Sequence, residues 1–264
     1  MKTRVRNGVF ERVVCGVDAS DAGVTAARVA GVVTDPDGTL MLVSVNDSSI
    51  AVKAGWRMAH VLDELAVEAR AALDRGGAEA APLHALEATL VEGDPLRSLM
   101  EEIARHDATA VIVGSHGLSR AAGIALGSVS THLLHEAPCA VLIARGSIEL
   151  DRWPRRIVVG VDGSGDSAGA FEAATALGTR FDADVRSIFA AKDAHADLVA
   201  ARRIAPYCEE HDARAIDALN VASERADLVV VGSRGRRGLG ALGSLSERLA
   251  HEARCSVLVV RSRA

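Results

Sequence analysis

Two kinds of residue that could carry chemistry occur twice in this chain, each time after a short run rich in valine. The first is an acid: Asp18 follows Val13–Val17, and Asp162 follows Ile157–Val161. The second is a glycine series that ends in a Gly-Ser pair. Its members are Gly114, Gly117, Gly127 and Ser128 in the first half, and Gly232, Gly235, Gly243 and Ser244 in the second. We take these residues as the candidate binding groups.

The chemistry that these residues favour is the binding of a nucleotide. Glycines let the backbone approach a ligand closely. Each Gly-Ser pair begins a predicted helix, where unpaired amides and the helix dipole favour phosphate. The dipole contributes only about 0.3–1 kcal/mol for an exposed charge, so several amides must act together. The carboxylates repel phosphate but accept hydrogen bonds from an amino group or a ribose hydroxyl. The alternatives are turn geometry without a ligand for the glycines and helix capping for the acids.

The positions of these residues follow from an internal repeat. Glu11–Ser20 returns as Arg155–Ser164 at an offset of 144, and Leu126–Arg145 returns as Leu242–Arg261 at an offset of 116. The two halves are therefore homologous, and the second half is shorter. We expect domains at residues 8–147 and 153–264, separated near residue 150 by a linker.

Short apolar runs alternate with helical periodicity in both halves. Strands are predicted at 13–17, 40–45, 88–91, 110–113 and 140–143, and again at 157–161, 185–189, 228–231 and 256–260. The third strand of the second half has no clear apolar run, and we expect a remnant near 205–208. Continuous apolar strands separated by helices indicate a parallel sheet covered on both faces. Each half is thus predicted to be a doubly wound α/β domain, with ligands beyond the carboxyl ends of the strands.

The chain resembles a tandem universal stress protein. The motif of the nucleotide-binding branch of that family, G-x2-G-x9-G-S/T, matches at full spacing from Gly114 to Ser128. The strand-end motif V-D-x-S also matches at 17–20 and 161–164, as does the tail A-P-C-A-V-L at 137–142. The resemblance implies two five-stranded, mostly parallel domains of the adenine nucleotide alpha hydrolase type, the second one truncated.

The resemblance further implies that ATP binds, with Mg²⁺ held through its phosphates. The implied residues of the first half are Asp18, Ala19, Ser20, Val45, Gly114, Ser115, His116, Gly117, Gly127, Ser128, Val129 and Ser130. Those of the second half are Asp162, Gly163, Gly232, Arg234, Gly235, Gly243, Ser244 and Ser246. The resemblance also implies pairing of the fifth strands, between the halves of one chain as a pseudo-dimer or between chains as a homodimer.

The second half departs from the family motif. Its glycine spacing is two residues shorter than in the first half, and 26 residues are missing from its middle. Arg234, Arg236 and Arg237 cluster in the shortened loop. They are interpreted either as charges for phosphate or as solvated surface groups.

Composition argues against several other classes of partner. The net charge is −5, so a basic surface that binds nucleic acid or an anionic membrane is not indicated. Aromatic residues make up only 3%, so stacking platforms for single-stranded nucleic acid are not indicated either. No apolar run reaches the roughly 18 residues that span a bilayer. No export signal is visible, and a cytoplasmic location is expected. The four cysteines form no C-x-x-C pair and indicate buried thiols rather than a disulfide or zinc framework.

Three further motifs have plainer interpretations. Gly165–Gly169 matches the nucleophile elbow G-x-S-x-G, but Ser167 lies six positions beyond its strand and is a glycine in the first half. Gly238–Gly243 matches a dinucleotide fingerprint but follows the fourth strand of its half. His132 and His135 are three apart on one predicted helix, and only His135 recurs in the repeat, which favours a polar helix face over a metal pair.

The favoured hypothesis is a non-enzymatic ATP-binding regulator of the stress response. No residue near the predicted phosphate end is an evident base for activating water, so slow hydrolysis stays open but is not predicted. One alternative is a tandem interaction module without a ligand. A further alternative is a small-molecule serine hydrolase that uses Ser167.

Overall fold

A computed structural model describes residues 8–47, 59–80, 86–117, 126–146, 148–149, 152–193, 196–233 and 244–261. The elements of the first half are β1 (Arg12–Gly16), α1 (Asp21–Val33), β2 (Thr39–Asn46), α3 (Ala59–Ala80), β3 (Leu86–Glu92), α4 (Pro95–Arg105), β4 (Ala110–Gly114), α5 (Ser128–Glu136) and β5 (Ala140–Ala144). Those of the second half are β6 (Arg156–Gly160), α6 (Gly165–Phe181), β7 (Asp184–Ala190), α7 (Leu198–Ile204), β8 (Glu209–His211), α8 (Ala215–Ser223), β9 (Leu228–Gly232), α9 (Ser244–Glu252) and β10 (Ser256–Val260).

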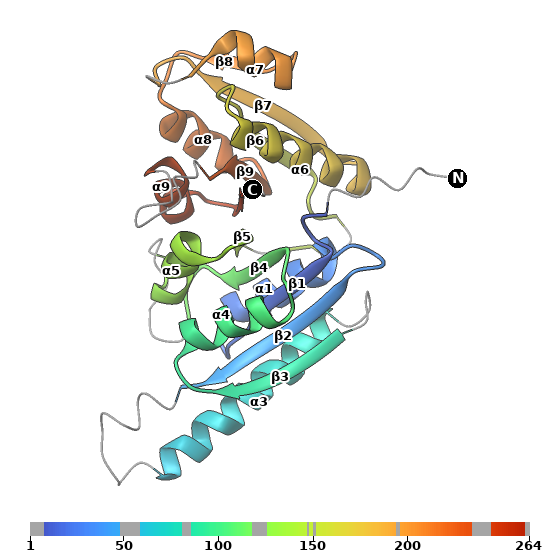
Figure 1. The fold of residues 1–264 in the computed structure, drawn as a ribbon, viewed down its shortest axis with the longest axis vertical. Coiled ribbons are helices and arrows are strands. Elements are labelled where there is room, and N and C mark those ends of the chain that lie inside the picture. Colours follow the sequence, from blue (N-terminus) through green and yellow to red (C-terminus); the bar gives the residue numbers. More distant parts are fainter. Residues whose placement is uncertain are drawn as a thin grey trace.

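The strands form one ten-stranded sheet in the order β3-β2-β1-β4-β5-β10-β9-β6-β7-β8 (Figure 1). Read outward from the middle, each half has the same order, and all pairs within a half are parallel. This confirms the predicted fold class of two doubly wound, mostly parallel α/β units. The nine predicted strands each overlap the observed ones, with ends that differ by a few residues at most.

The predicted third strand of the second half was misplaced. The structure puts residues 205–208 in the turn before β8, and β8 itself pairs Glu209–His211 with Ile188–Ala190. β8 is the outermost strand on its side of the sheet and has polar residues, so it needs no apolar run. The residues from which a strand was predicted, 205–208, therefore end directly before β8.

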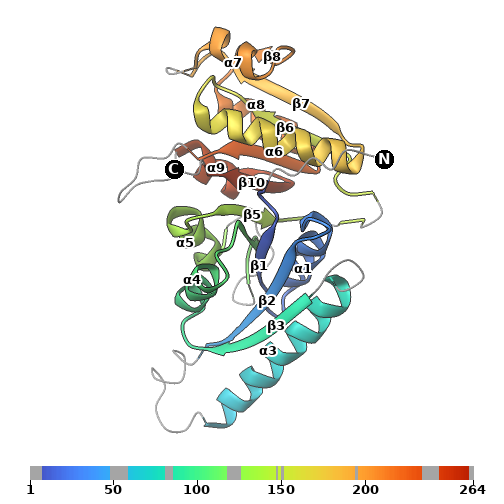
Figure 2. The same cartoon turned by 45° about the vertical axis from the view of Figure 1, so that its right-hand side comes forward.

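Side-chain alternation explains why the inner strands are apolar throughout. Val13 and Cys15 of β1 belong to an apolar layer under α1, α3 and α6, whereas Val14 belongs to a second layer under α4, α5, α8 and α9. Figure 2 shows helices on both sides of the sheet. Both faces are thus covered, and the strand ends remain as the places where a ligand can reach the backbone.

The two halves join where β5 and β10 pair antiparallel. Val257 lies opposite Ile143, and Val259 lies opposite Val141. The structure thus contains the pairing of fifth strands that the family resemblance implied, here within one chain.

Two arginines at equivalent positions of the repeat fasten this junction reciprocally. Arg145 of the first half donates to the carbonyls of Ala250, over 2.9 Å, and Ala253 at the end of α9. Arg261 of the second half donates to the carbonyl of Leu134 near the end of α5. Burial lowers the pKa of both guanidinium groups. Each half therefore satisfies the carbonyls that end a helix of the other half.

A third arginine crosses the junction on the opposite face of the sheet. Arg180, in the last turn of α6, donates to the carbonyls of Val32, Val33 and Thr34 over 2.9, 2.7 and 2.7 Å. These carbonyls end α1, so a cation there also suits the negative end of the helix dipole. The halves are thus joined by the sheet and by helix ends on both faces.

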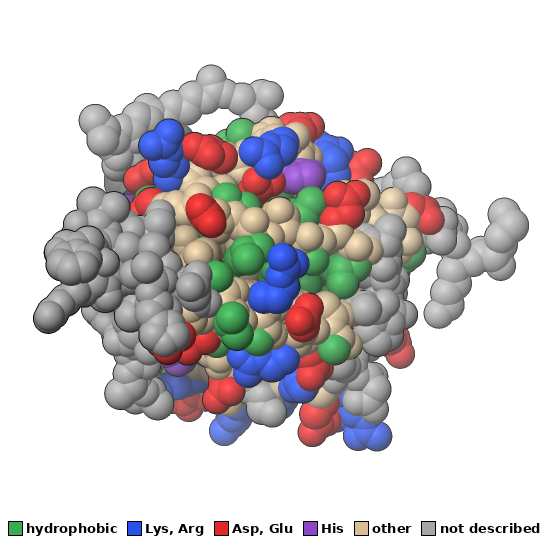
Figure 3. Space-filling model, turned by 90° about the horizontal axis from the view of Figure 1, so that it is seen from below, with side chains coloured by type: hydrophobic (Ala, Val, Ile, Leu, Met, Phe, Trp, Pro, Cys, Tyr) green, Lys and Arg blue, Asp and Glu red, His purple; other side chains and the backbone are tan. Residues whose placement is uncertain are grey.

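At the end of the molecule seen in Figure 3, basic and acidic side chains are interspersed over the visible part. Among the helices that the structure describes, none combines the length and apolar character needed to cross a membrane.

Arg145→Ala is expected to lower the free energy of unfolding by about 1–3 kcal/mol, because two buried helix-end carbonyls lose their donor. Arg261→Ala should have the same sign. Chemical denaturation of the full chain measures both. Arg97→Ala is the matched control, since Arg97 is exposed and pairs only with Glu101 on its own helix; a loss of about 0.3–0.5 kcal/mol is expected there. Equal losses in all three variants would contradict the role of the junction arginines.

Candidate functional site

The candidate residues of the first half meet at the carboxyl edge of its strands. The Oδ2 atom of Asp18, which follows β1, lies only 2.6 Å from where a Cβ on Gly117 would stand. The backbone N–H of Gly127 donates to the carbonyl of Ser115 over 2.7 Å and holds the start of α5 against the end of β4. The structure therefore brings together the acid and the second and third glycines of the series.

Each acid also fastens the helix that follows it. Asp18 Oδ1 accepts from the backbone N–H of Ser20, at 3.1 Å, and from the Ser20 hydroxyl, which caps α1. In the second half, the N–H and hydroxyl of Ser164 donate to Asp162 Oδ1 over 3.0 and 2.6 Å. Helix capping thus accounts for one oxygen of Asp18. The other oxygen, Oδ2, lies beside Gly117 and accepts no hydrogen bond from the described residues.

The first glycine of each series has a packing role. A Cβ on Gly114 would lie 2.7 Å from the backbone carbon and oxygen of Ala22 in the first turn of α1. A Cβ on Gly232 would lie 2.5 and 2.6 Å from the same atoms of Asp166 in α6. Strand and helix backbones approach so closely that no other residue fits without movement. Packing alone therefore explains these two glycines.

A serine hydroxyl repeats beside each of these glycines. Ser130 Oγ donates to the carbonyl of Gly114 over 2.8 Å, and Ser246 Oγ donates to that of Gly232 over 3.0 Å. Both serines are buried. The hydroxyls therefore tie α5 and α9 to the strands β4 and β9 and bring the two helix N-termini to the sheet edge.

The N-terminus of α5 is open toward the site. Gly127 is its N-cap and provides no side-chain cap, in contrast to Ser20 and Asp94 at the starts of α1 and α4. The first helical bond runs from Thr131 N to Gly127 O, so the amides of residues 128–130 precede it. A Cβ on Gly127 would come no closer than 3.4 Å to the described residues, an ordinary contact distance. Packing against those residues does not demand glycine here, and Gly127 places no side chain over the three amides.

The remaining candidates of the first half lie along the same edge. Val45 is partly buried in β2 and packs on the apolar layer that α4 covers. The carbonyl of Ala19 accepts from Arg75 Nη2 over 3.3 Å. Ser115 Oγ and His116 Nδ1 lie 3.0 Å apart within hydrogen-bond distance.

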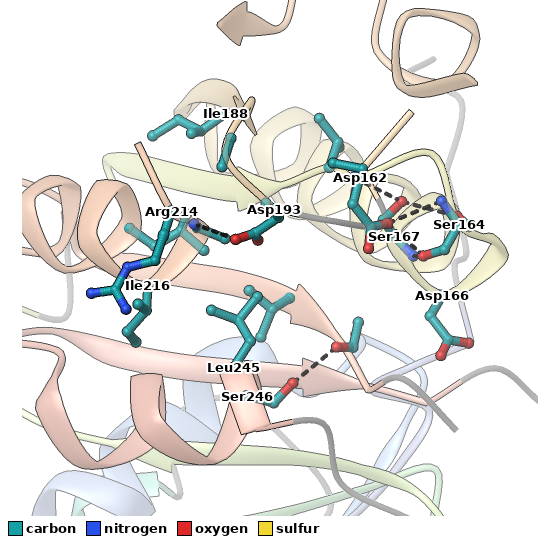
Figure 4. Close-up of a pocket in the computed structure, with 18 of the residues that line it drawn as sticks. Asp162, Ser164, Asp166, Ser167, Ile188, Asp193, Arg214, Ile216, Leu245 and Ser246 are labelled. Atoms are coloured by element: carbon teal, nitrogen blue, oxygen red, sulfur yellow. Dashed lines mark hydrogen bonds between the residues drawn. The ribbon is translucent and has the colours of Figure 1, made fainter. Parts of the chain in front are cut away.

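A cavity of about 290 Å³ opens at the carboxyl edge of the second half (Figure 4). The apolar side chains of its lining are Val161, Ile188, Ala190, Ala196, Ala215, Ile216, Leu219, Val231 and Leu245. The polar and charged ones are Asp162, Ser164, Asp166, Ser167, Asp193, Arg214, Ser246 and Arg248. An apolar surface with a few convergent polar groups is typical of small-ligand sites.

Only some of the sequence-based candidates of the second half lie at this cavity. Those that line the cavity are Asp162, Gly232 and Ser246. Gly163 does not line it: its φ of +87° and the 2.7 Å between its would-be Cβ and Ala200 show that it lets α7 pack closely. Ser244 is the first residue of α9. Arg234, Gly235 and Gly243, together with Arg236 and Arg237, lie outside the described residues.

Sequence reasoning missed four charged residues of this cavity. They are Asp166, Asp193, Arg214 and Arg248. Arg248 occupies the repeat position of His132, and the loss of the histidine there served only as an argument against a metal pair. Arg214 and Asp193 lie in connections that have no apolar pattern, and only the fold brings them to the strand ends.

The geometry around Ser167 does not support a nucleophile. Its hydroxyl donates to the carbonyl of Ser164 over 2.9 Å and lies 3.4 Å from the backbone N–H of Asp162. In the part of the chain that the structure describes, no histidine is hydrogen-bonded to it. Ser167 instead belongs to the first turn of α6.

His132, His135 and the four cysteines are not arranged for metal binding or for redox chemistry. His132 Nδ1 lies 2.7 Å from the carbonyl of Ser128, whereas His135 pairs with Glu247 across the junction at 3.5 Å. No group of three metal-binding side chains occurs among the described residues. All four cysteines are buried without a disulfide, and burial raises the pKa of Cys139 to about 11 and that of Cys255 to about 12. Neither of these two thiols is poised as a thiolate.

Comparison with known proteins decides the family. Residues 10–145 and 207–261 match the family model of the universal stress protein family. A universal stress protein of Mycolicibacterium smegmatis is 30% identical, over 95% of this chain and 97% of that protein. The chain belongs to the universal stress protein family.

One further relative agrees with this assignment, and one solved structure shares the fold. A universal stress protein of Mycobacterium tuberculosis is 36% identical over 59% of this chain, and the match spans 62% of that protein's length. The crystal structure of a universal stress protein from Archaeoglobus fulgidus superposes with a TM-score of 0.73 at 21% identity, covering 96% of this chain and 98% of that chain. That likeness shows that both halves together share the architecture of this universal stress protein.

Substitution of the glycines separates packing from binding. Gly114→Ala is expected to destabilise the chain by about 1–3 kcal/mol, because the new Cβ overlaps the backbone of α1. Gly127→Ala should cost less than about 1 kcal/mol, the usual range for a changed N-cap. Thermal unfolding followed by circular dichroism measures both. A larger loss for Gly127→Ala than for Gly114→Ala would contradict the assigned roles.

Proposed function

We propose that this universal stress protein binds ATP in its first half and acts as a non-enzymatic regulator of the stress response in the cytoplasm. The observation that carries the proposal is the uncapped N-terminus of α5, which begins at Gly127 beside Asp18 and Gly117. Phosphates would lie against the amides of residues 128–130, and the free oxygen of Asp18 would accept from the ribose or base. Mg²⁺ would arrive with the phosphates.

The chemistry of the site supports binding rather than turnover. Ser130 already donates its hydroxyl to Gly114, and His116 shares a hydrogen bond with Ser115. Neither is arranged as a base that would activate water, and one oxygen of Asp18 is held by the amide and hydroxyl of Ser20. We therefore propose a ligand-binding protein, with at most slow hydrolysis.

The two halves are proposed to act as an intrachain pseudo-dimer. The pairing of β5 with β10 and the crossing arginines Arg145, Arg180 and Arg261 support this arrangement. The second half contributes a related site, since its cavity includes Asp162, Gly232 and Ser246.

A thermal shift with ATP and Mg²⁺ tests the proposal. Ligand at about 100 times its Kd should add about 2.7 kcal/mol to the stability of the chain. Gly127→Glu should abolish the part of this shift due to the first half, because bulk and negative charge occupy the phosphate position while the Cβ itself fits.

Gly77→Glu is the matched control, since Gly77 lies on α3 and its Cβ would meet, among the described residues, only the Leu86 side chain at 3.6 Å. It should leave the ATP shift unchanged. A wild-type chain that millimolar ATP does not stabilise would support the tandem interaction module without a ligand. An ATP affinity that Gly127→Glu leaves unaltered would place the site elsewhere.

A further inference from the structure

The carboxylate of Asp18 lies between two glycines that come from distant parts of the first half. Its Oδ1 atom lies 2.5 Å from where a Cβ on Gly23, the third residue of α1, would stand. Its Oδ2 atom lies 2.6 Å from the corresponding point on Gly117, which follows β4. Carbon and oxygen atoms repel each other at such distances, so the carboxylate keeps this position only while both residues lack a side chain.

Ser20 fixes which oxygen of the acid faces which glycine. Its backbone N–H donates to Asp18 Oδ1 over 3.1 Å, and its hydroxyl donates to the same oxygen. The Oγ atom of Ser20 also accepts from the backbone N–H of Gly23 over 3.1 Å, so the acid, the cap and the glycine form one connected turn. Oδ1 is therefore held on the side of α1, and Oδ2 is the oxygen left for a ligand.

The second half makes the same turn with a side chain at this position. Ser167 is the third residue of α6, at the repeat offset of 144 from Gly23. Its backbone N–H donates to Oγ of the capping residue Ser164 over 3.2 Å, as that of Gly23 does to Ser20. The fold of this turn therefore does not require glycine.

The glycines that serve packing differ from Gly23 in this respect. Gly114 and Gly232 end β4 and β9, and a Cβ on either would lie 2.7 Å or less from a helix backbone. Glycine occurs at this position in both halves, as it does at Gly16 and Gly160, which end β1 and β6. At position 23, only the first half has glycine, and what the glycine accommodates there is the acid.

A side chain at position 23 would displace the acid. Besides Oδ1, the backbone O and N of Asp18 lie 2.5 and 2.8 Å from the Cβ position of Gly23. The same arrangement would bring the Cβ of Ser167 just as close to Asp162, so the acid of the second half cannot lie against its helix as Asp18 does. The residue at this one position therefore decides whether the acid can take the place that Asp18 has.

We propose that Gly23 is a positioning residue of the first-half site: it lets Asp18 lie against α1, so that Oδ2 meets the ribose or base of the nucleotide. This inference rests on the proposed binding of ATP by the first half. In that proposal the phosphates lie against a different element, the N-terminus of α5. A change at Gly23 should therefore weaken recognition of the nucleoside part and leave recognition of the phosphates unaltered.

Calorimetric titration of the full chain with ATP and Mg²⁺ tests this role, and the binding that Gly127→Glu removes is assigned to the first half. Gly23→Ser should weaken this binding roughly tenfold to a hundredfold, the factor for a lost hydrogen bond to a charged group. Gly23→Ala, which adds the Cβ alone, should act in the same direction. In an Asp18→Ala chain, Gly23→Ser should change the affinity by less than about twofold, because the acid that it displaces is already absent.

Inorganic triphosphate gives a second readout, because it has phosphates and no nucleoside. At millimolar concentration it should shift the thermal unfolding of the wild-type and Gly23→Ser chains by the same amount. Gly169→Ser is the matched control, since it adds the same side chain to α6, where a Cβ would meet, among the described residues, only Val260 at 3.8 Å. It should leave the ATP affinity unaltered.

An ATP affinity that Gly23→Ser leaves unaltered, or an equal loss in the Asp18→Ala chain, would overturn the inference. So would a Gly23→Ser chain that circular dichroism shows to be unfolded, because glycine would then be a requirement of the fold. ATP binding by the wild-type chain that Gly127→Glu removes would still support the proposed function after any of these results. A wild-type chain that does not bind ATP would overturn both, so the two failures are distinguishable.

Discussion

The antiparallel pairing of β5 with β10 is the constraint on which the rest of the molecule depends. All other strand pairs are parallel, so this single reversal turns the second half around relative to the first. The carboxyl ends of the two sets of strands consequently lie at opposite edges of one sheet. Ligands of parallel sheets bind at those ends, and each half therefore has its candidate site on its own side. Arg145 and Arg261 hold the reversal in place by satisfying helix ends across the junction.

The same groups that build each strand end are also its candidate binding groups. One oxygen of Asp18 organises the start of α1, while the other rests on Gly117 and stays available. The glycines also differ in role. Gly114 lets α1 approach the sheet, whereas Gly127 is not required for packing against the described residues and provides no side-chain cap for the amides of α5. A site of this kind needs little added machinery, because the unpaired backbone groups of helix termini are already present wherever a helix begins.

The repeat shows how two copies of one scaffold acquire different chemistry. The hydroxyl of Ser130 donates to the carbonyl that ends β4, and the hydroxyl of Ser246 donates to the carbonyl that ends β9. This part of the scaffold is therefore the same in both halves. The charges around it are not retained. His132 is replaced by Arg248, and the helix-capping Asp94 is replaced by Arg214, which faces a cavity. Exchange at such positions leaves the sheet unaltered because these side chains lie at its edge and not in its apolar layers.

The sequence by itself determined the repeat, the doubly wound class and the inner strands, because alternating burial on two faces forces runs such as Val13–Val17 to be apolar throughout. It also marked Asp18 and the glycines as residues of the strand ends. Only the tertiary structure decided that the short polar strand β8 extends the sheet and that Gly114 serves packing while Gly127 stays open. Those outcomes depend on contacts between residues far apart in the chain. Asp193 and Arg214 belong to the same class, since their connections carry no periodic pattern and meet only once β7 and α8 are in place.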